Sequence, residues 1–242
     1  MSLDLDQVRA EIAPKGMLRA GINLSNFLLV TGKSESGQPE GVSPSMAAEI
    51  ARRLDLDIQY VTFKTPGELA DAATDDVWDI GLIGAEPARA QHITFTKAYS
   101  EIEATYLVPA GSSLNSIDDV DQPGIRISVP ARAAFELWLT DNIKHAELHR
   151  APGRQAYDDF IEQKMDALAG LRAGLVNDVE KLPGSRMLEG KFTSVQQAIG
   201  TPKGREVTAQ FLSEFVADAK ESGLIAQFID RFNVTGRLTV AP

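Results

Sequence analysis

Arginine and glutamate side chains are the groups in this sequence whose types and spacing could do chemistry. Arg89 lies in the stretch GLIGAEPARAQHITFT (81–96), just past a Gly and a Pro and between two apolar strands. A guanidinium can bind a carboxylate through two parallel hydrogen bonds, although Arg89 taken by itself is predicted to be a solvated helix residue. Glu101 and Glu103 would share one face of a strand. Such a pair suits acid–base catalysis, but a surface strand explains it equally well.

Metal and cofactor chemistry has little support in the sequence. His145 and His149, in the predicted strand KHAELHRA, have no third ligand, so both are predicted to be solvated, and His92 is predicted to lie on the surface. The chain has no cysteine, which excludes disulfides, thiolate metal sites and a cysteine nucleophile. The motifs GxGxxG, GxxxxGK[ST], GxSxG and HExxH do not occur. We therefore predict neither a metal nor a cofactor.

The net charge and the apolar runs of the sequence indicate which partners to expect, and its first residues bear on the cellular compartment. The net charge of −10 argues against nucleic acid, because backbone phosphates are bound by clustered Lys and Arg. A small anion would need a few local arginines and backbone N–H groups. The sequence lacks an apolar run long enough to predict a transmembrane helix. The start, MSLDLDQVRAEIAPKG, does not resemble a secretory signal, so we expect a periplasmic or extracellular protein if an export signal was trimmed and a cytoplasmic one if the chain is complete.

Short apolar strands alternate with amphipathic helices along the chain, and these elements must position the charged residues. Thr65 and Glu68 form a capping box, and Ser43 is predicted to cap a helix whose first position is Pro44. The pattern restarts after a Pro/Gly break at 109–111, which indicates a second domain. The predicted strands are 18–24, 58–63, 78–85, 103–111, 125–129, 146–151, 167–171 and 192–204. The predicted helices are 43–54, the helix that the capping box at Thr65 opens, 133–143, 158–165, 175–182 and 206–232. The last of these would have Phe211, Phe215, Ala219, Leu224 and Phe228 on one face. This alternation predicts an α/β fold with mostly parallel sheets, whose ligands bind at the carboxyl ends of strands.

The order of several segments resembles the family 3 solute-binding proteins of ABC importers, which are type II periplasmic binding proteins. The resemblance runs from about Met17 to Phe232. The segments that carry it are LRAGINLSNF, GVSPSMAAEIARRLDLDIQYVTF, VWDIGLIGAEPARAQHITFTKAYSEIEATYLV, IDDVDQPGIRISVPARAAFELWL, MDALAGL and ESGLIAQFIDRF. Each motif is weak alone, but together and in this order they are specific.

The resemblance implies a two-lobed fold, in which each lobe is a mostly parallel sheet flanked by helices and two hinge crossovers join the lobes. Lobe 1 would comprise 1–107 and 199–242, and lobe 2 would comprise 108–198. The implied function is the substrate-binding component of an ABC importer, a monomer that binds a small carboxylate-bearing solute in the inter-lobe cleft and delivers it to an ABC permease. The implied protein is not an enzyme.

The resemblance also implies a set of ligand contacts. Family members hold the α-carboxylate of the ligand with the Arg that matches Arg89. Asn23 and Asn26 would supply amide contacts, and Phe27 would form an aromatic wall. The full set of expected ligand-binding residues is Asn23, Asn26, Phe27, Phe63, Gly84, Ala85, Arg89, Glu103, Arg132, Arg172 and Gln197.

Four departures from the family pattern bear on the ligand. Glu86 stands where a Thr is usual, Arg132-Ala133 replaces a Gly followed by Ser or Thr, and the P-P-F part of the first loop is absent. Leu171-Arg172 occupies the place of the Asp that holds the α-ammonium group. One hypothesis is therefore an organic acid held by Arg89 with Arg172 or Arg132. The other is an amine-bearing ligand whose positive end meets Glu103.

Two other functions are compatible with the same scaffold. A few relatives are cyclohexadienyl or arogenate dehydratases, and such an enzyme would need an acid–base carboxylate, for which Glu103 is the candidate. A ligand-sensing module without a transporter is the third possibility.

Overall fold

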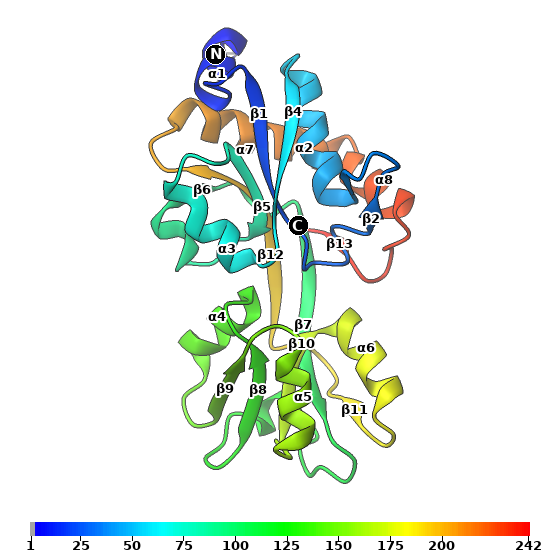
Figure 1. Cartoon of the computed structure of the whole chain (residues 1–242). Coiled ribbons are helices and arrows are strands. Elements are labelled where there is room, and N and C mark those ends of the chain that lie inside the picture. The colour runs from blue at the N-terminus through cyan, green and yellow to red at the C-terminus, as the bar shows by residue number, and fades with distance from the viewer. Residues whose placement is uncertain (1–2) are drawn as a thin grey trace. The chain divides into compact units, whose positions relative to one another are not determined.

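The computed structural model describes residues 3–242, which separate into two compact units (Figure 1). Unit 1 comprises the chain up to Glu101 together with Gln196–Pro242, and unit 2 comprises Ile102–Val195. The chain leaves unit 1 within strand β7 (Ser100–Val108) and returns to it within strand β12 (Thr193–Pro202). Unit 1 is therefore built from two separate stretches of sequence, whereas unit 2 is a single stretch.

The sheet of unit 1 centres on β1 (Met17–Asn23), which pairs in parallel with β4 (Asp57–Phe63) and β5 (Ile80–Gly84). All residues of β1 except Met17 are buried, as expected for a parallel strand covered on both faces. The antiparallel part of the sheet is formed by β12 on β5, β6 (Ile93–Phe95) on β12, and β13 (Thr239–Val240) on the start of β7. A separate small hairpin pairs β2 (Gly32–Lys33) with β3 (Pro39–Glu40).

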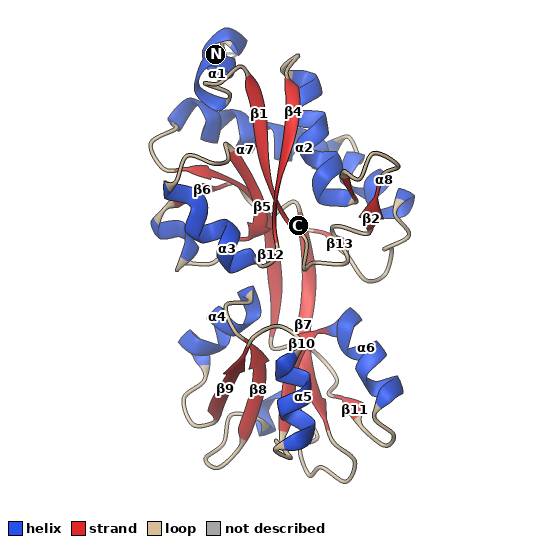
Figure 2. Cartoon of the chain, viewed as in Figure 1, coloured by secondary structure: helices blue, strands red, loops and turns tan. Residues whose placement is uncertain are grey.

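Five α-helices flank this sheet (Figure 2): α1 (Leu5–Ile12), α2 (Val42–Arg53), α3 (Pro66–Asp71), α7 (Glu206–Glu221) and α8 (Leu224–Arg231). The capping box of Thr65 and Glu68 is confirmed at the start of α3. The predicted cap of α2 is wrong, because the helix begins at Val42, two residues before Pro44, and its N-cap is Gly41. Gly41 has a φ of 148°, and a Cβ there would overlap the carbonyl of Leu29. Ser43 instead lies inside the helix, where its hydroxyl is 2.9 Å from the hydroxyl of Tyr99.

The buried face of the C-terminal helical region also differs from the prediction. Phe211, Phe215 and Ala219 of α7 are buried as expected, but α8 buries Ile225 and Ile229 and leaves Leu224 and Phe228 half-buried. Gly223, between the two helices, adopts the left-handed conformation with a φ of 72°. The helical phase restarts after this residue, so the periodicity of α7 does not continue into α8.

The sheet of unit 2 has the strand order β7, β10 (Ala167–Leu171), β8 (Arg126–Pro130), β9 (Glu147–Ala151). The strands β8, β9 and β10 are parallel, whereas β7 and the short β11 (Arg186–Met187) are antiparallel. Three α-helices pack on the sheet: α4 (Ala134–Asn142), α5 (Gln155–Glu162) and α6 (Arg172–Lys181). Tyr106 and Val108 join Phe135 of α4 in one apolar cluster, and Leu107 joins Phe160 of α5 in a second.

Several predicted boundaries in unit 2 are shifted. Helix α5 lies three residues earlier than predicted and ends before Lys164, whose φ of 50° is left-handed and stops the helix. Helix α6 begins at Arg172 instead of residue 175, because Gly174 weakens the helical signal of its first turn without preventing the helix. Within residues 3–242, no helix is both long and apolar enough to cross a membrane.

Candidate ligand-binding site

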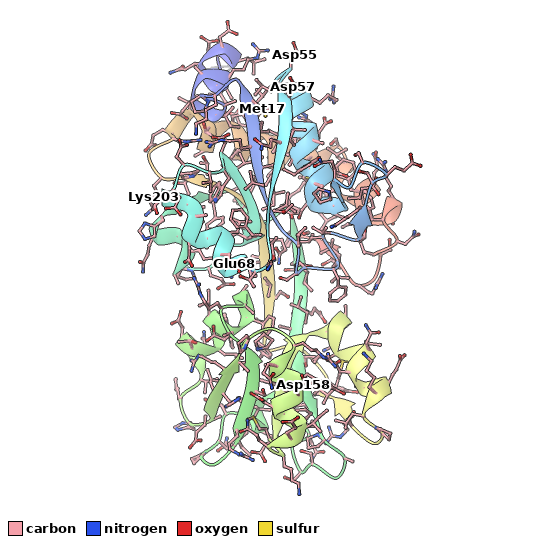
Figure 3. All side chains as sticks on the ribbon, in the orientation of Figure 1. Met17, Asp55, Asp57, Glu68, Asp158 and Lys203 are labelled. Atoms are coloured by element: carbon pink, nitrogen blue, oxygen red, sulfur yellow. The ribbon has the colours of Figure 1, made fainter. Side chains whose placement is uncertain are left out.

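The carboxyl ends of the three parallel strands in unit 1 bring together residues that the sequence singled out. Strand β1 ends at Asn23, β4 ends at Phe63, and β5 ends at Gly84. Asn23 and Phe63 lie opposite each other in the strand register. Figure 3 shows Met17 and Asp57, the first residues of β1 and β4, at one end of unit 1, and Glu68 of α3 at the other end, where these strands finish. This edge is where α/β sheets bind ligands.

Arg89 is buried at this edge of unit 1. Its side chain belongs to the 3-10 turn η2 (Arg89–Gln91), the residue is only 6% exposed, and Nη1 donates a hydrogen bond of 2.8 Å to the carbonyl oxygen of Gly84. The interpretation of Arg89 as a solvated helix residue is therefore wrong. The chain after β5 folds back so that the guanidinium lies beside the end of the strand it has just left.

A Pro-started helix with free N–H groups was expected around Arg89, but the structure has a single 3-10 turn there. The backbone N–H groups of Arg89 and Ala90 both donate to the carbonyl oxygen of Glu86, at 3.0 Å each. These donors are therefore engaged within the turn. A carboxylate bound here would depend on the Arg89 side chain.

Residues from the returning strand β12 reach the same edge. Gln197 is opposite Gly84 in the β5–β12 register and is 4% exposed. The N–H of Ala85 donates to the carbonyl oxygen of Gln196 at 2.8 Å. The fold thus places Gly84, Ala85, Arg89 and Gln197 together, although Gln197 is more than a hundred residues from the others.

The loop after β1 adds amides and an aromatic ring. The Oδ1 atom of Asn23 accepts hydrogen bonds from Ser25, and that of Asn26 accepts one from the N–H of Leu28. For residues 3–242, the structure records no hydrogen-bond partner for the side-chain nitrogen of either asparagine. Phe27 is 42% exposed. The loop therefore offers two amide donors and an exposed aromatic face.

In unit 2, an arginine follows the carboxyl end of each parallel strand. Arg132 follows β8, Arg154 follows β9, and Arg172 follows β10. Arg132 has a left-handed φ of 62°, and its N–H donates to Glu136 Oε2 at 2.9 Å. Arg154 Nη1 is 2.6 Å from Asp178 Oδ1. Arg154 is a residue that was not predicted as a ligand contact, although its position after a predicted strand matches that of the other two.

Arg172 and Glu103 are paired with each other. The register of β10 on β7 places Leu171 opposite Ala104, so the flanking residues Arg172 and Glu103 become neighbours. Arg172 Nε donates to Glu103 Oε2 at 2.9 Å, and its Nη2 donates to the carbonyl oxygen of Gly190. Lys191 Nζ lies 3.6 Å from Glu103 Oε1. Arg172, the expected partner of an organic acid, and Glu103, the expected partner of an amine-bearing ligand, are therefore the two members of one ion pair.

The three histidines lie in different surroundings. His92 and His145 are exposed as predicted, but His149 is half-buried and its Nε2 lies 2.7 Å from Asp159 Oδ2, so its predicted full solvation is wrong. The hydrogen bond with His149 lowers the pKa of the Asp159 carboxyl. Across residues 3–242, no group of three or more histidine and acidic side chains is arranged to hold a metal ion.

A second buried arginine lies near the amino ends of the strands in unit 1. Arg19 Nη2 is 2.6 Å from Asp79 Oδ1, and Arg205 Nη1 is 3.0 Å from the same oxygen. Asp79 is fully buried. The hydrogen bond to Asp79 is the main cause of a raised pKa for Arg19. This network was not predictable from local sequence, because its members come from three distant segments.

Comparison with known proteins assigns the chain to a family. The family model for bacterial extracellular solute-binding proteins, family 3, matches residues 21–235, so the chain belongs to this family, as its motifs indicated. No curated protein sequence matches the chain.

Solved structures confirm the predicted α/β fold of the periplasmic-binding-protein type. A mutant of ArgBP from T. maritima is 19% identical with a TM-score of 0.72, covering 94% of this chain and 99% of its own. A putative ABC-transporter binding component from Wolinella succinogenes DSM 1740, complexed with lysine, is 19% identical with a TM-score of 0.73 and covers 90% and 95%. The ancestral amino acid-binding protein AncCDT-1, a precursor of cyclohexadienyl dehydratase, is 17% identical with a TM-score of 0.72 and covers 96% and 99%.

Proposed function

We propose that this protein is the substrate-binding component of an ABC importer and that it binds a small solute through a carboxylate held by Arg89. The observation that carries the proposal is the buried guanidinium of Arg89 at the carboxyl ends of β1, β4 and β5. A planar, permanently charged guanidinium suits two-pronged recognition of a carboxylate. Its contact with Gly84 fixes its position before the ligand arrives.

The remaining residues of this edge would complete the contact. The amide nitrogens of Asn23 and Asn26 can donate to carboxylate or hydroxyl oxygens, and Phe27 offers apolar surface for the carbon skeleton. The net charge of −10 opposes the approach of an anion. Affinity would therefore come from local contacts with Arg89 and its neighbours, and not from long-range attraction.

The proposed partner is an ABC permease, and the proposed compartment is the periplasm or the cell exterior. Both proposals are supported by the family, whose description is extracellular solute binding. Capture of the permease complex with the tagged protein, together with cell fractionation, would test them. Recovery of the protein only from the cytoplasm, without a permease, would favour the sensing function instead.

We propose binding and not catalysis for this site. Glu103, the carboxylate that a dehydratase would need, is ion-paired with Arg172 and Lys191. We therefore expect prephenate to remain unconverted at high protein concentration, as measured by product absorbance. Measurable conversion that is lost in Glu103→Gln would establish the enzymatic alternative.

The test of the proposed site is a thermal-shift screen with amino acids, polyamines, di- and tricarboxylates and aromatic acids. A ligand at a hundred times its Kd adds about 2.7 kcal/mol to the free energy of unfolding, which a melting curve resolves. The best ligand is then titrated by calorimetry into Arg89→Gln and Arg89→Lys. Removal of a charge-assisted contact should weaken binding about ten- to a hundredfold or more, and lysine should restore only part of it.

The matched control is Arg52→Gln, which changes an exposed arginine of α2 in the same unit. It should leave affinity unchanged. Melting curves without ligand would show that the Arg89 variants are folded. A folded Arg89→Gln protein with wild-type affinity would exclude Arg89 as the carboxylate contact.

A further inference from the structure

Strand β4 lies at the outer edge of the sheet in unit 1. It is the last strand in the sheet order, and it pairs with β1 along its whole length. None of the residues of β4 is fully buried, in contrast to β1. Figure 1 shows α2 and α3 on opposite sides of β4. The hydroxyl of Tyr60 donates to the carbonyl oxygen of Pro44 in α2, and Phe63 packs against the apolar cluster that contains Leu69 of α3. The two helices therefore cover the faces of the strand and not its edge.

The outward backbone groups of β4 have no strand beside them. The N–H of Leu24 donates to the carbonyl oxygen of Phe63 at 2.9 Å, so the backbone of Phe63 faces β1. Because the direction of these groups alternates along a strand, Ile58, Tyr60 and Thr62 point their N–H and C=O groups away from β1. For residues 3–242, the structure records no hydrogen bond to these groups. Such a row of unpaired donors and acceptors is a template for another strand.

Strand β4 also lacks the residues that normally discourage pairing at an edge. Its segment 58–63, IQYVTF, contains no charged residue, glycine or proline. The edge strand of unit 2, β9, differs, because Glu147 and Arg150 place two charges within its five residues. Charged side chains and prolines on an edge oppose association with another molecule. By this criterion β9 is protected and β4 is not.

The outward groups of β4 are complementary to those of a second copy in antiparallel orientation. A register centred on Tyr60 places Tyr60 opposite the same residue of the second copy, and Ile58 opposite Thr62. All three outward residues of each strand then lie in hydrogen-bonded pairs. Each such pair exchanges two N–H to O=C bonds, so the two strands would share about six hydrogen bonds.

The charges at the two ends of β4 favour this antiparallel orientation. Asp55 and Asp57 lie at the amino end of the strand, where Figure 3 labels them, and both are exposed. Lys64 and Glu68, which have opposite charges, follow its carboxyl end. Antiparallel pairing brings each acidic end next to Lys64 of the other copy, whereas parallel pairing would place two acidic ends together.

We infer that two copies of this protein associate through antiparallel pairing of their β4 strands, with Tyr60 at the two-fold axis. The same surface is used by both copies, as two-fold symmetry requires. One strand from each copy makes a small interface, so the dimer should form in the range between about 1 µM and about 1 mM. The family resemblance implied a monomer, which is then the form at low concentration. The inference does not depend on the ligand or on the proposed function.

Cysteine cross-linking tests the register, because the chain has no cysteine of its own. The register places Gln59 opposite Val61 of the second copy in a non-hydrogen-bonded pair, with Cα atoms about 4.5 Å apart, which a disulfide can span. Gln59→Cys and Val61→Cys proteins, one of them tagged, are mixed and oxidised with oxidised glutathione. The mixed disulfide should form at least about tenfold faster than in a mixture of Gln59→Cys with Glu35→Cys, since Glu35 is an exposed residue of the same unit outside the interface.

Analytical ultracentrifugation tests the backbone pairing. The wild type should show a dimer that increases with concentration. Thr62→Pro removes an outward N–H and leaves the pairing with β1 intact, a substitution that edge strands tolerate. It should weaken the dimer at least about tenfold, because both pairs of Ile58 with Thr62 lose a hydrogen bond. The matched control Thr62→Ala keeps the N–H and should dimerise like the wild type.

Three results would overturn the inference. The first is a wild type that stays monomeric up to about 1 mM. The second is a folded Thr62→Pro protein that dimerises as tightly as Thr62→Ala. The third is cross-linking of Gln59→Cys with Val61→Cys that is no faster than with Glu35→Cys, which would place any association at another surface or register. If the melting curve shows that Thr62→Pro is unfolded, the cross-linking rates decide.

Discussion

Two buried arginines of unit 1 lie at opposite ends of the strands. Arg19 meets the buried carboxylate of Asp79, with additional contacts to Asp76, near the amino ends of the strands. This position suits a structural role. Arg89 donates to the carbonyl oxygen of Gly84, where β5 ends. Its position at the carboxyl ends of the strands is the reason why we propose a ligand contact for it.

Asp79→Asn should be strongly destabilising. Asp79 accepts hydrogen bonds from Arg19 and Arg205 at a fully buried position, and loss of its charge leaves two arginines poorly compensated. Removal of one member of a buried ion pair typically costs about 3–5 kcal/mol. Urea denaturation would measure this loss. Asp75→Asn, at an exposed position four residues earlier, should change the free energy of unfolding by less than about 0.5 kcal/mol; equal effects of the two variants would contradict a structural role for Asp79.

At the scale of elements, an ion pair connects the helices α2 and α7, because Arg53 Nη1 is 2.6 Å from Asp218 of α7. Glu49 of α2 accepts hydrogen bonds from Arg52 and from the same Arg53. The hydrogen bond from Arg52, supported by Arg53, lowers the pKa of the Glu49 carboxyl from its ordinary value of 4.5 to about 2. A carboxylate whose pKa is lowered on folding stabilises the protein only while it is ionised.

Glu49→Gln should therefore make the melting temperature less dependent on acidic pH. Near pH 7 the variant should be less stable than the wild type by about 1 kcal/mol. The difference should begin to shrink as the pH falls below about 4.5 and should disappear only below about pH 2, where the folded carboxyl also becomes protonated. Melting curves across this range would measure it. Glu35→Gln, an exposed residue between β2 and β3, should run parallel to the wild type; a constant gap for Glu49→Gln would contradict the pKa argument.

Long elements were predictable from local sequence, but contacts between distant elements were not. The strands β4 and β10 and the capping box of α3 follow from apolar runs and cap residues. Helix α1 and the short strands β2, β3, β11 and β13 were missed; strands of two residues are too short for a periodic signal, and they form only where a partner strand lies beside them.

In the candidate site, too, local features were predictable from the sequence and contacts between distant residues were not. The motif order located Arg89 near Gly84, but its burial depends on how the chain folds back after β5. The pairing of Arg172 with Glu103 joins residues 69 positions apart and follows from the register of β10 on β7. No local pattern specifies such a register. Sequence analysis therefore identified both residues but could not predict that they contact each other.

At the scale of the whole molecule, the last strand completes unit 1. Strand β13 pairs with Ser100 and Glu101 of β7, the N–H of Ala241 donates to Tyr99, and Lys220 Nζ donates to the carbonyl oxygen of Pro242. The C-terminal residues thus hold the point at which the chain leaves unit 1.

Deletion of residues 239–242 should lower the free energy of unfolding by about 2 kcal/mol, because several hydrogen bonds and the buried Ala241 are lost. Calorimetric melting would measure the change. The control is Val240→Thr, which keeps the backbone pairing and alters an exposed side chain, and it should stay within about 0.5 kcal/mol of the wild type. A truncated protein as stable as the wild type would show that β13 is dispensable.

The division of unit 1 into two stretches also sets an order of events during synthesis. A ribosome makes the first 101 residues of unit 1, then all of unit 2, and only then the segment that begins at Gln196. One edge of β5 stays unpaired until its partner β12 has been translated. Strand β13, which pairs with β7, is translated after the other strands of unit 1. Unit 2 can therefore acquire all its own strands while unit 1 still has exposed strand edges.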